Sequence, residues 1–152
     1  AWRSPDDINA RMHMHNASAL AGIAFTNASL GLVHAMAHKI GGEFGITHGL
    51  ANAIMLPYII RYNAKFTKKY RQLEAALDIN NLSEAINALN QRLGVPKTLS
   101  QCGEVEINEI TFVNVLDRMS HHAVDDPCTL TNPNHPSVQD VKGLYTQAFY
   151  GA

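Results

Sequence analysis

Three histidines in one short segment are the residues of this sequence best suited to bind a metal ion. His34 and His38 are four residues apart, so they share one face if the segment is helical. His48 follows His38 by ten residues, beyond the Gly41-Gly42 pair, where a turn can bring a third imidazole back toward the first two. Imidazole binds Fe, Zn, Cu and Ni well. The spacing therefore indicates a candidate metal site, with ordinary partly buried histidines as the alternative interpretation.

Two other uses of histidine are less well supported. A zincin peptidase needs a glutamate directly after the first histidine as general base, and Ala35 occupies that position. His13 and His15 are two residues apart and point to different sides of a helix. We therefore interpret His13 and His15 as structural or surface residues.

The elements that would position these histidines are helices. Apolar residues recur at helical spacing from about residue 8 to 42, and polar residues at 26–29 predict a break between two helices. Ser4 is the expected cap of the first helix, and Gly41-Gly42 the expected end of the second. Both helices carry almost no charge, which predicts that they are buried. Further helices are expected over residues 48–62, 65–77, 81–93, 108–122 and 137–150.

The fold class that follows is all-α, with about seven helices and no convincing strand. Loops are expected over residues 97–105 and 125–136. A chain of 152 residues, 46% of them apolar, normally forms one domain around one core.

Composition also limits the kinds of partner and the cellular compartment that we expect. The net charge is −1 without a basic stripe, so we expect no nucleic-acid partner. No run approaches 18 apolar residues, so we expect no membrane-spanning segment. Only two cysteines, Cys102 and Cys128, are present, which favours a reduced cytoplasmic setting over a disulfide scaffold.

The stretch from residue 21 to 63 resembles the signature region of the iron-containing (group III) alcohol dehydrogenases. Lactaldehyde reductases and the alcohol dehydrogenase half of bifunctional aldehyde–alcohol dehydrogenases share this region. Looser similarity continues to the C-terminus. The matching segments are Ala21–Phe25, Asn27-Ala28, Leu30-Gly31, His34–His38, Gly41-Gly42, His48–Ala53, Leu56-Pro57, Arg61–Asn63, Gly94–Pro96, Asp125–Thr129 and Asn132-Pro133.

The resemblance implies one helical metal-binding catalytic domain over residues 1–152. This would be the C-terminal helical domain of the dehydroquinate synthase-like/iron alcohol dehydrogenase fold. His34 and His48 match two of the family's metal ligands. His38 matches a histidine that lines the site beside the nicotinamide without binding the metal, so it is the implied catalytic and cofactor-binding residue. The implied substrate-pocket residues are Phe25, Leu30 and Cys128.

The sequence also departs from the family pattern. The family takes two more metal ligands, an Asp and a His four residues later, from a helix upstream, and no Asp-x-x-x-His precedes His34 here. The Gly-rich turn of the family's N-terminal nucleotide-binding domain is absent as well. We therefore expect a fragment that is inactive alone, that needs the missing N-terminal half as partner, and that forms a homo-oligomer.

The function implied by the resemblance is a metal-dependent, NAD(P)-linked alcohol dehydrogenase. It would interconvert a small primary alcohol or diol and its aldehyde, with Fe²⁺ (or Zn²⁺, which suits the same ligands) and either NAD or NADP as cofactors. An alternative is a naturally truncated, non-catalytic helical module that binds a partner or a full-length paralogue. A third possibility is a small helical metal-binding protein.

Overall fold

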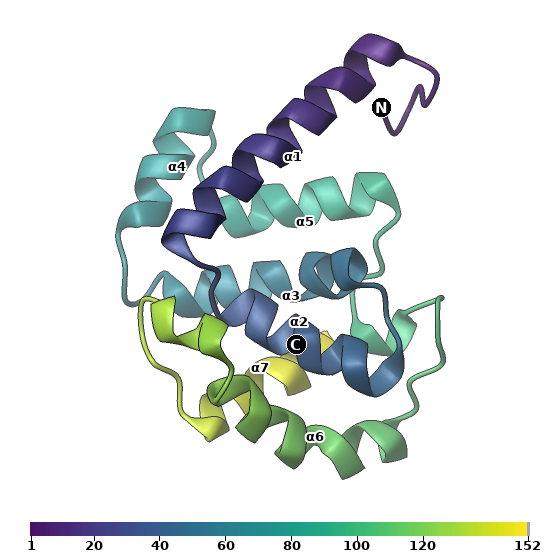
Figure 1. Ribbon diagram of the computed structural model, residues 1–152. Helices are drawn as coiled ribbons and strands as arrows, with labels where there is room; N and C mark the ends of the chain where they lie inside the picture. The colour runs from purple at the N-terminus through teal and green to yellow at the C-terminus, as the bar shows by residue number, and fades with distance from the viewer. Residues whose placement is uncertain (152) are drawn as a thin grey trace. The chain divides into compact units, whose positions relative to one another are not determined.

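The computed structural model describes residues 1–151, and the chain divides into two compact units, Ala1–Leu30 and Gly31–Ala152 (Figure 1). The described residues form seven α-helices and two short 3-10 helices, with no strand among them. The prediction of an all-α chain with about seven helices is therefore confirmed.

The first unit is built on a single long helix, α1 (Ile8–Ala28). Its N-cap is Asp7, whose carboxylate accepts a hydrogen bond from the Ala10 amide at 3.0 Å. The prediction that Ser4 caps this helix is therefore wrong, because Asp7 satisfies a free amide of the first turn instead. At the other end, the Asn27 side chain donates to the Ile23 carbonyl, and Ser29 adopts a positive φ of 61°. The predicted break is present, but it lies at residues 29–31, just after the expected position at 26–29.

The apolar side chains of α1 are exposed, which contradicts the prediction that this helix is buried. None of its residues is buried, and Ile8 and Leu20 are 76% and 66% exposed. The physical reason is that the first unit consists of one helix, which cannot cover its own apolar face.

The centre of the second unit is α2 (Leu32–Phe44), which packs against α3 (His48–Asn63) and α6 (Glu109–Val124). The Tyr145 hydroxyl, itself fully buried, donates to the Met36 carbonyl at 3.0 Å and joins α7 (Val138–Tyr150) to this centre. The side chains of α2 that are buried in the core are Leu32, Ala35, Met36, Ala37 and Ile40.

Gly41 and Gly42 do not end α2, contrary to the prediction. The helix continues to Phe44, and Gly45 terminates it with a left-handed φ of 75°. Gly41 serves a packing purpose, because a Cβ there would lie 3.3 Å from the Ile46 carbonyl oxygen. The absence of a side chain at residue 41 thus lets the chain fold back closely after the helix.

The remaining helices of the second unit are α4 (Lys69–Leu77), α5 (Leu82–Leu93) and two 3-10 helices, η1 (Leu99–Gln101) and η2 (Pro127–Thr131). Two differences from the predicted boundaries have local causes. The helix expected from residue 65 begins at Lys69, because the Phe66 amide closes a turn onto Asn63 after α3. The loop expected at 125–136 contains η2, whose first turn is capped by Asp126. Ser137 caps α7, and Asp140 completes a capping box with it, at the start of the helix expected over residues 137–150.

Within the second unit, α5 packs on α3, α3 packs on α2 and α7, and α6 covers the far side of α2 and α7 (Figure 1). No single helix among residues 1–151 has both the length and the hydropathy to cross a membrane. Only α1 and α2 taken together, as a pair broken at residues 29–31, have the length and composition expected of a membrane-spanning segment.

Candidate functional site

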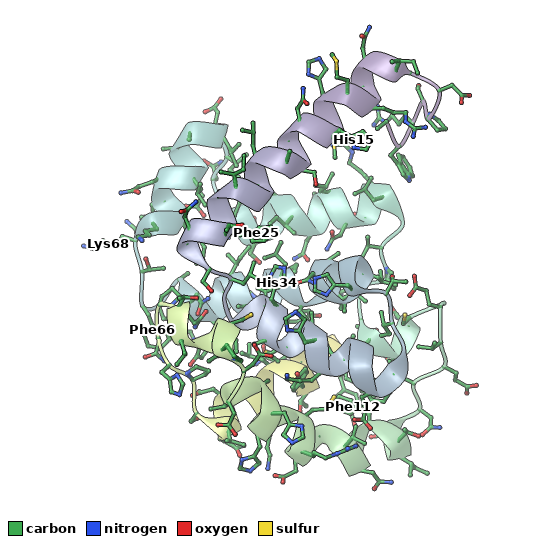
Figure 2. All side chains as sticks on the ribbon, viewed as in Figure 1. His15, Phe25, His34, Phe66, Lys68 and Phe112 are labelled. Carbon is green, nitrogen blue, oxygen red and sulfur yellow. The ribbon has the colours of Figure 1, made fainter. Side chains whose placement is uncertain are left out.

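The three histidines predicted to form a site lie together on the second unit. The rings of His34 and His48 have centroids 5.3 Å apart, and the His38 ring stacks on His48 at 5.4 Å with an interplanar angle of 19°. His34 and His38 lie edge to face at 6.1 Å. Both extend from α2, the helix from which His34 projects in Figure 2.

The pattern of buried residues in α2 explains why its two histidines lie on the face turned away from the core. The core contacts of α2 occupy residues 32, 35, 36, 37 and 40. Positions 34 and 38 fall on the opposite side of the helix, one turn apart. His34 is therefore only partly buried, and 37% of the His38 side chain is exposed.

The start of α3 brings His48 to the same place. Its N-cap, Thr47, is fixed by Glu104, whose carboxylate accepts hydrogen bonds from the Thr47 amide and hydroxyl, both at 2.9 Å. His48 is the first residue of the helix that follows. The tight return through Gly45 and the Thr47–Glu104 contacts thus set the third imidazole beside the other two.

The separation of the His34 and His48 rings is compatible with two imidazoles that share one metal ion. An imidazole nitrogen binds zinc at about 2.0–2.1 Å, which puts two tetrahedrally arranged ring centroids roughly 5 Å apart. The observed separation is 5.3 Å. Burial, and then the neighbouring His48 and His38, lower the pKa of His34 below its ordinary value. The neutral form that binds metals is therefore favoured at this position.

Asn52, one turn after His48, adds a second observation about the site. Its side-chain Nδ2 lies 3.1 Å from His48 Nε2 and 2.9 Å from the His48 carbonyl oxygen. Its Oδ1 is buried and has no hydrogen-bond partner within residues 1–151. Native structures rarely leave such an atom unsatisfied, and an orphaned acceptor beside a donor set is consistent with a site that takes a further group.

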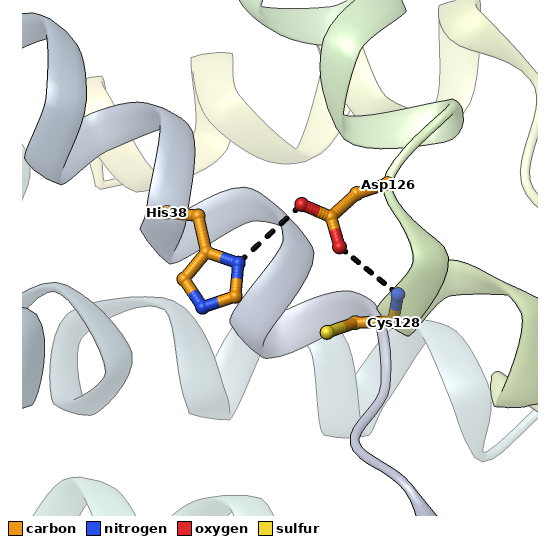
Figure 3. A group of neighbouring side chains, drawn as sticks. All are labelled: His38, Asp126 and Cys128. Atoms are coloured by element: carbon orange, nitrogen blue, oxygen red, sulfur yellow. Dashed lines mark hydrogen bonds and ion pairs between the residues drawn. The ribbon is translucent and has the colours of Figure 1, made fainter.

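A buried carboxylate that the sequence reasoning did not single out also borders the site. Asp126, only 7% exposed, accepts from Lys39 Nζ at 2.8 Å and from His38 Nδ1 at 3.4 Å (Figure 3). The sequence does contain a feature that predicts a buried carboxylate, because Lys39 is a charged residue in a mostly buried helix and such a residue needs a counter-charge. The sequence could not say which carboxylate supplies it.

Cys128 lies in the same cluster, at the loop that follows α6. Its amide donates to Asp126 Oδ1 at 2.9 Å, and ligand atoms of Cys128, Asp126 and His38 lie within 4.8 Å of one another. Burial and the Asp126 carboxylate raise the pKa of the Cys128 thiol, so the unreactive thiol form is favoured. The ammonium of Lys39 already neutralises Asp126, which makes this cluster a hydrogen-bonded network and not a good cation site.

Two of the predicted substrate-pocket residues belong to the first unit. Phe25, 47% exposed on α1, and Leu30 belong to the first unit, so their part in a substrate pocket stays a prediction. His13 and His15 are exposed on the same helix. Cys102 and Cys128 are both free cysteines.

Comparison with known proteins gives one consistent result. Residues 1–149 match the family described as Fe-containing alcohol dehydrogenase, C-terminal. The chain is 39% identical to an NADPH-dependent butanol dehydrogenase of Clostridium saccharobutylicum, over 95% of this chain and 39% of that protein. It is 36% identical to the lactaldehyde reductase of Escherichia coli K12, over 94% and 39% of the two chains.

Comparison with solved structures identifies the same family. An iron-containing alcohol dehydrogenase from Thermococcus thioreducens matches with a TM-score of 0.86 and 36% identity, over 96% of this chain and 39% of that one. The chain thus spans about two fifths of the length of these relatives. It belongs to the iron-containing alcohol dehydrogenase family, a family of oxidoreductases, and corresponds to its C-terminal helical part.

Proposed function

We propose that this chain is the helical, metal-binding part of an NAD(P)-linked alcohol dehydrogenase that interconverts a small primary alcohol or diol and its aldehyde. The observation that carries the proposal is the approach of the His34 and His48 rings to 5.3 Å, at the two positions that the resemblance implies as metal ligands. The names of relatives, a butanol dehydrogenase and a lactaldehyde reductase, support small alcohols and aldehydes as the substrate class.

In this proposal His34 and His48 hold the ion, Fe²⁺ or Zn²⁺, together with two ligands from outside the chain. The bound ion supplies Lewis-acid stabilisation of negative charge on the substrate oxygen. His38, which contacts Asp126 and the rings of His34 and His48, would line the site beside the nicotinamide without binding the ion. Phe25, Leu30 and Cys128 limit the size of the substrate.

A metal titration followed by NMR tests the ligand assignment on the chain itself. Zn²⁺ added to the ¹⁵N-labelled protein should shift the imidazole resonances of His34 and His48 together and leave those of His13 and His15 in place. His34→Gln and His48→Gln should each abolish the paired shift, whereas the matched control His13→Gln should not. Equal shifts at His13 and His15, or an unchanged response of His34→Gln, would overturn the assignment.

The coding sequence upstream of Ala1 tests the enzymatic part of the proposal. An upstream frame with Asp-x-x-x-His and a Gly-rich turn is expected, and the full-length product should oxidise small alcohols with NAD⁺ or NADP⁺. The chain of 152 residues alone should show no turnover, because half of the metal ligands and most of the nucleotide site are absent from it. A frame that starts at Ala1 would instead favour the non-catalytic module.

A further inference from the structure

Asp126 is placed to control the ring of His38. The carboxylate is 7% exposed and accepts three hydrogen bonds: from Lys39 Nζ at 2.8 Å and His38 Nδ1 at 3.4 Å on Oδ2, and from the Cys128 amide at 2.9 Å on Oδ1. Two of these donors are neighbours on α2, and the third belongs to η2. Figure 3 shows the His38 ring with Nδ1 turned toward Asp126 and the other nitrogen on the far side of the ring.

The charge state of Asp126 determines which ring nitrogen of His38 carries the proton. Burial by itself raises the pKa of the carboxyl group, but the hydrogen bonds from Lys39, from the Cys128 amide and from His38 outweigh it and hold the pKa well below its usual range. An ionised carboxylate only accepts hydrogen bonds. The Nδ1 atom of His38 must therefore carry the proton in this contact.

We propose that Asp126 is a positioning residue, which locks neutral His38 as the Nδ1–H tautomer and leaves the lone pair of Nε2, the nitrogen turned away from Asp126, available as an acceptor. The hydrogen bond made by one ring nitrogen sets the protonation of the other. The same arrangement of carboxylate and histidine orients imidazoles around metal sites. The role of the free Nε2 as an acceptor in the reaction rests on the proposed function; the tautomer itself does not.

Lys39 balances the charge of the buried Asp126 carboxylate. A buried carboxylate facing a neutral imidazole alone would be costly, and the ammonium at 2.8 Å offsets that cost. Because Lys39 and His38 are consecutive on α2, one carboxylate can hold both. Asp126 is in turn fixed by its role as the cap of η2. The ring orientation of His38 is thus tied to the loop that also carries Cys128.

Long-range ¹H–¹⁵N spectra of the purified chain, recorded above the usual imidazole pKa, test this proposal. The wild-type protein should show His38, assigned by its loss in His38→Gln, with a protonated Nδ1 and an unprotonated Nε2. In Asp126→Ala the protonated nitrogen should change to Nε2, whereas Asp126→Asn, which keeps an acceptor oxygen, should retain most of the Nδ1–H form. Asp125→Ala, which removes an exposed neighbouring carboxylate, is the matched control and should leave the wild-type pattern unchanged.

Two outcomes would overturn the proposal. One is a wild-type His38 that is protonated on Nε2, a result that needs no variant and so does not depend on the folding of Asp126→Ala. The other is an unchanged tautomer in a folded Asp126→Ala. Neither outcome depends on metal binding or turnover, so failure here and failure of the dehydrogenase proposal are distinguishable.

Discussion

At the scale of single residues, the histidine cluster combines an imidazole whose pKa is lowered, His34, with a paired carboxylate, Asp126. The His34 ring is partly withdrawn from water and sits between two other imidazoles, so its protonation is disfavoured. Asp126 shows the opposite behaviour, since its donors favour the charged form. Groups with such opposed environments are typical of functional sites.

The affinity of this chain for metal should be weak. Two imidazoles, His34 and His48, leave the other coordination positions to water and lose the preorganisation of a complete shell. Calorimetric titration with Zn²⁺ should therefore give a dissociation constant above roughly 1 μM, which corresponds to about −8 kcal/mol. His34→Ala/His48→Ala should reduce binding further, and His13→Ala/His15→Ala should not. A single sub-micromolar site on the wild-type chain would contradict this expectation.

The stability contributed by Asp126 should depend on pH with a definite sign. Its pKa is depressed in the folded protein, so its contribution is fully present above the ordinary carboxyl pKa and is lost as the pH falls toward the folded value. Asp126→Asn should lower the free energy of unfolding by about 1–3 kcal/mol at neutral pH, because Lys39 loses its charged partner. Urea unfolding of both proteins should show this difference shrinking below about pH 4, because Asp126 of the wild type then takes up a proton in the unfolded chain while it stays ionised in the folded protein. A difference that grows on acidification, or an equal effect of Asp125→Asn, would refute the assignment.

At the scale of elements, a pair of amide side chains connects α3 to the loop after η2. Asn63 and Asn132 exchange two reciprocal hydrogen bonds, each of 2.8 Å. The Oδ1 atom of Asn132 also accepts from the Leu32 amide at the start of α2, at 3.3 Å. Two amides therefore join the ends of three elements, and α2, which carries His34 and His38, begins at this junction.

Loss of the amide pair should destabilise the second unit. Asn132→Ala leaves the 3%-exposed Asn63 amide and the Leu32 amide without their partners, and a buried unsatisfied polar group costs about 1–3 kcal/mol. Thermal or urea unfolding should register this loss. Asn114→Ala, at an exposed position of α6, is the matched control and should change stability by less than about 0.5 kcal/mol. Similar stability of both variants would show that the pair contributes little.

At the scale of the whole molecule, exposed apolar surface is the most notable property. The side chains of Ile8, Leu20 and Ile23 on α1 are all more than 60% exposed. Large exposed apolar patches normally mark surfaces that bind another protein. The family's other domain, or a second copy of the chain, is the partner expected from the sequence.

The isolated chain should therefore self-associate. Light scattering over a range of concentrations should show a mass above that of the monomer, with Leu20→Glu/Ile23→Glu shifting the distribution toward the monomer. His13→Glu/His15→Glu on the same helix controls for added charge. A monodisperse wild-type monomer at high concentration would contradict the prediction.

The sequence by itself determined the class of the fold and the positions of most helices. Helical periodicity and the i, i+4 spacing of His34 and His38 are local properties, so they could be recognised without the structure. The end of α2 was misplaced because Gly41 and Gly42 resemble a stop signal, whereas Gly41 lies inside the helix and faces the Ile46 carbonyl, which a Cβ at this position would approach to 3.3 Å.

Only the tertiary structure decided which distant residues meet the histidines. Asp126 lies 88 residues from His38 in the chain, and no local pattern relates a carboxylate in a loop to an imidazole on a helix. The same holds for the approach of His48 to His34, which the sequence allowed but could not require. Local propensities indicate which segments are helical, whereas contacts between distant side chains depend on how the helices pack, because packing is determined by the whole core at once.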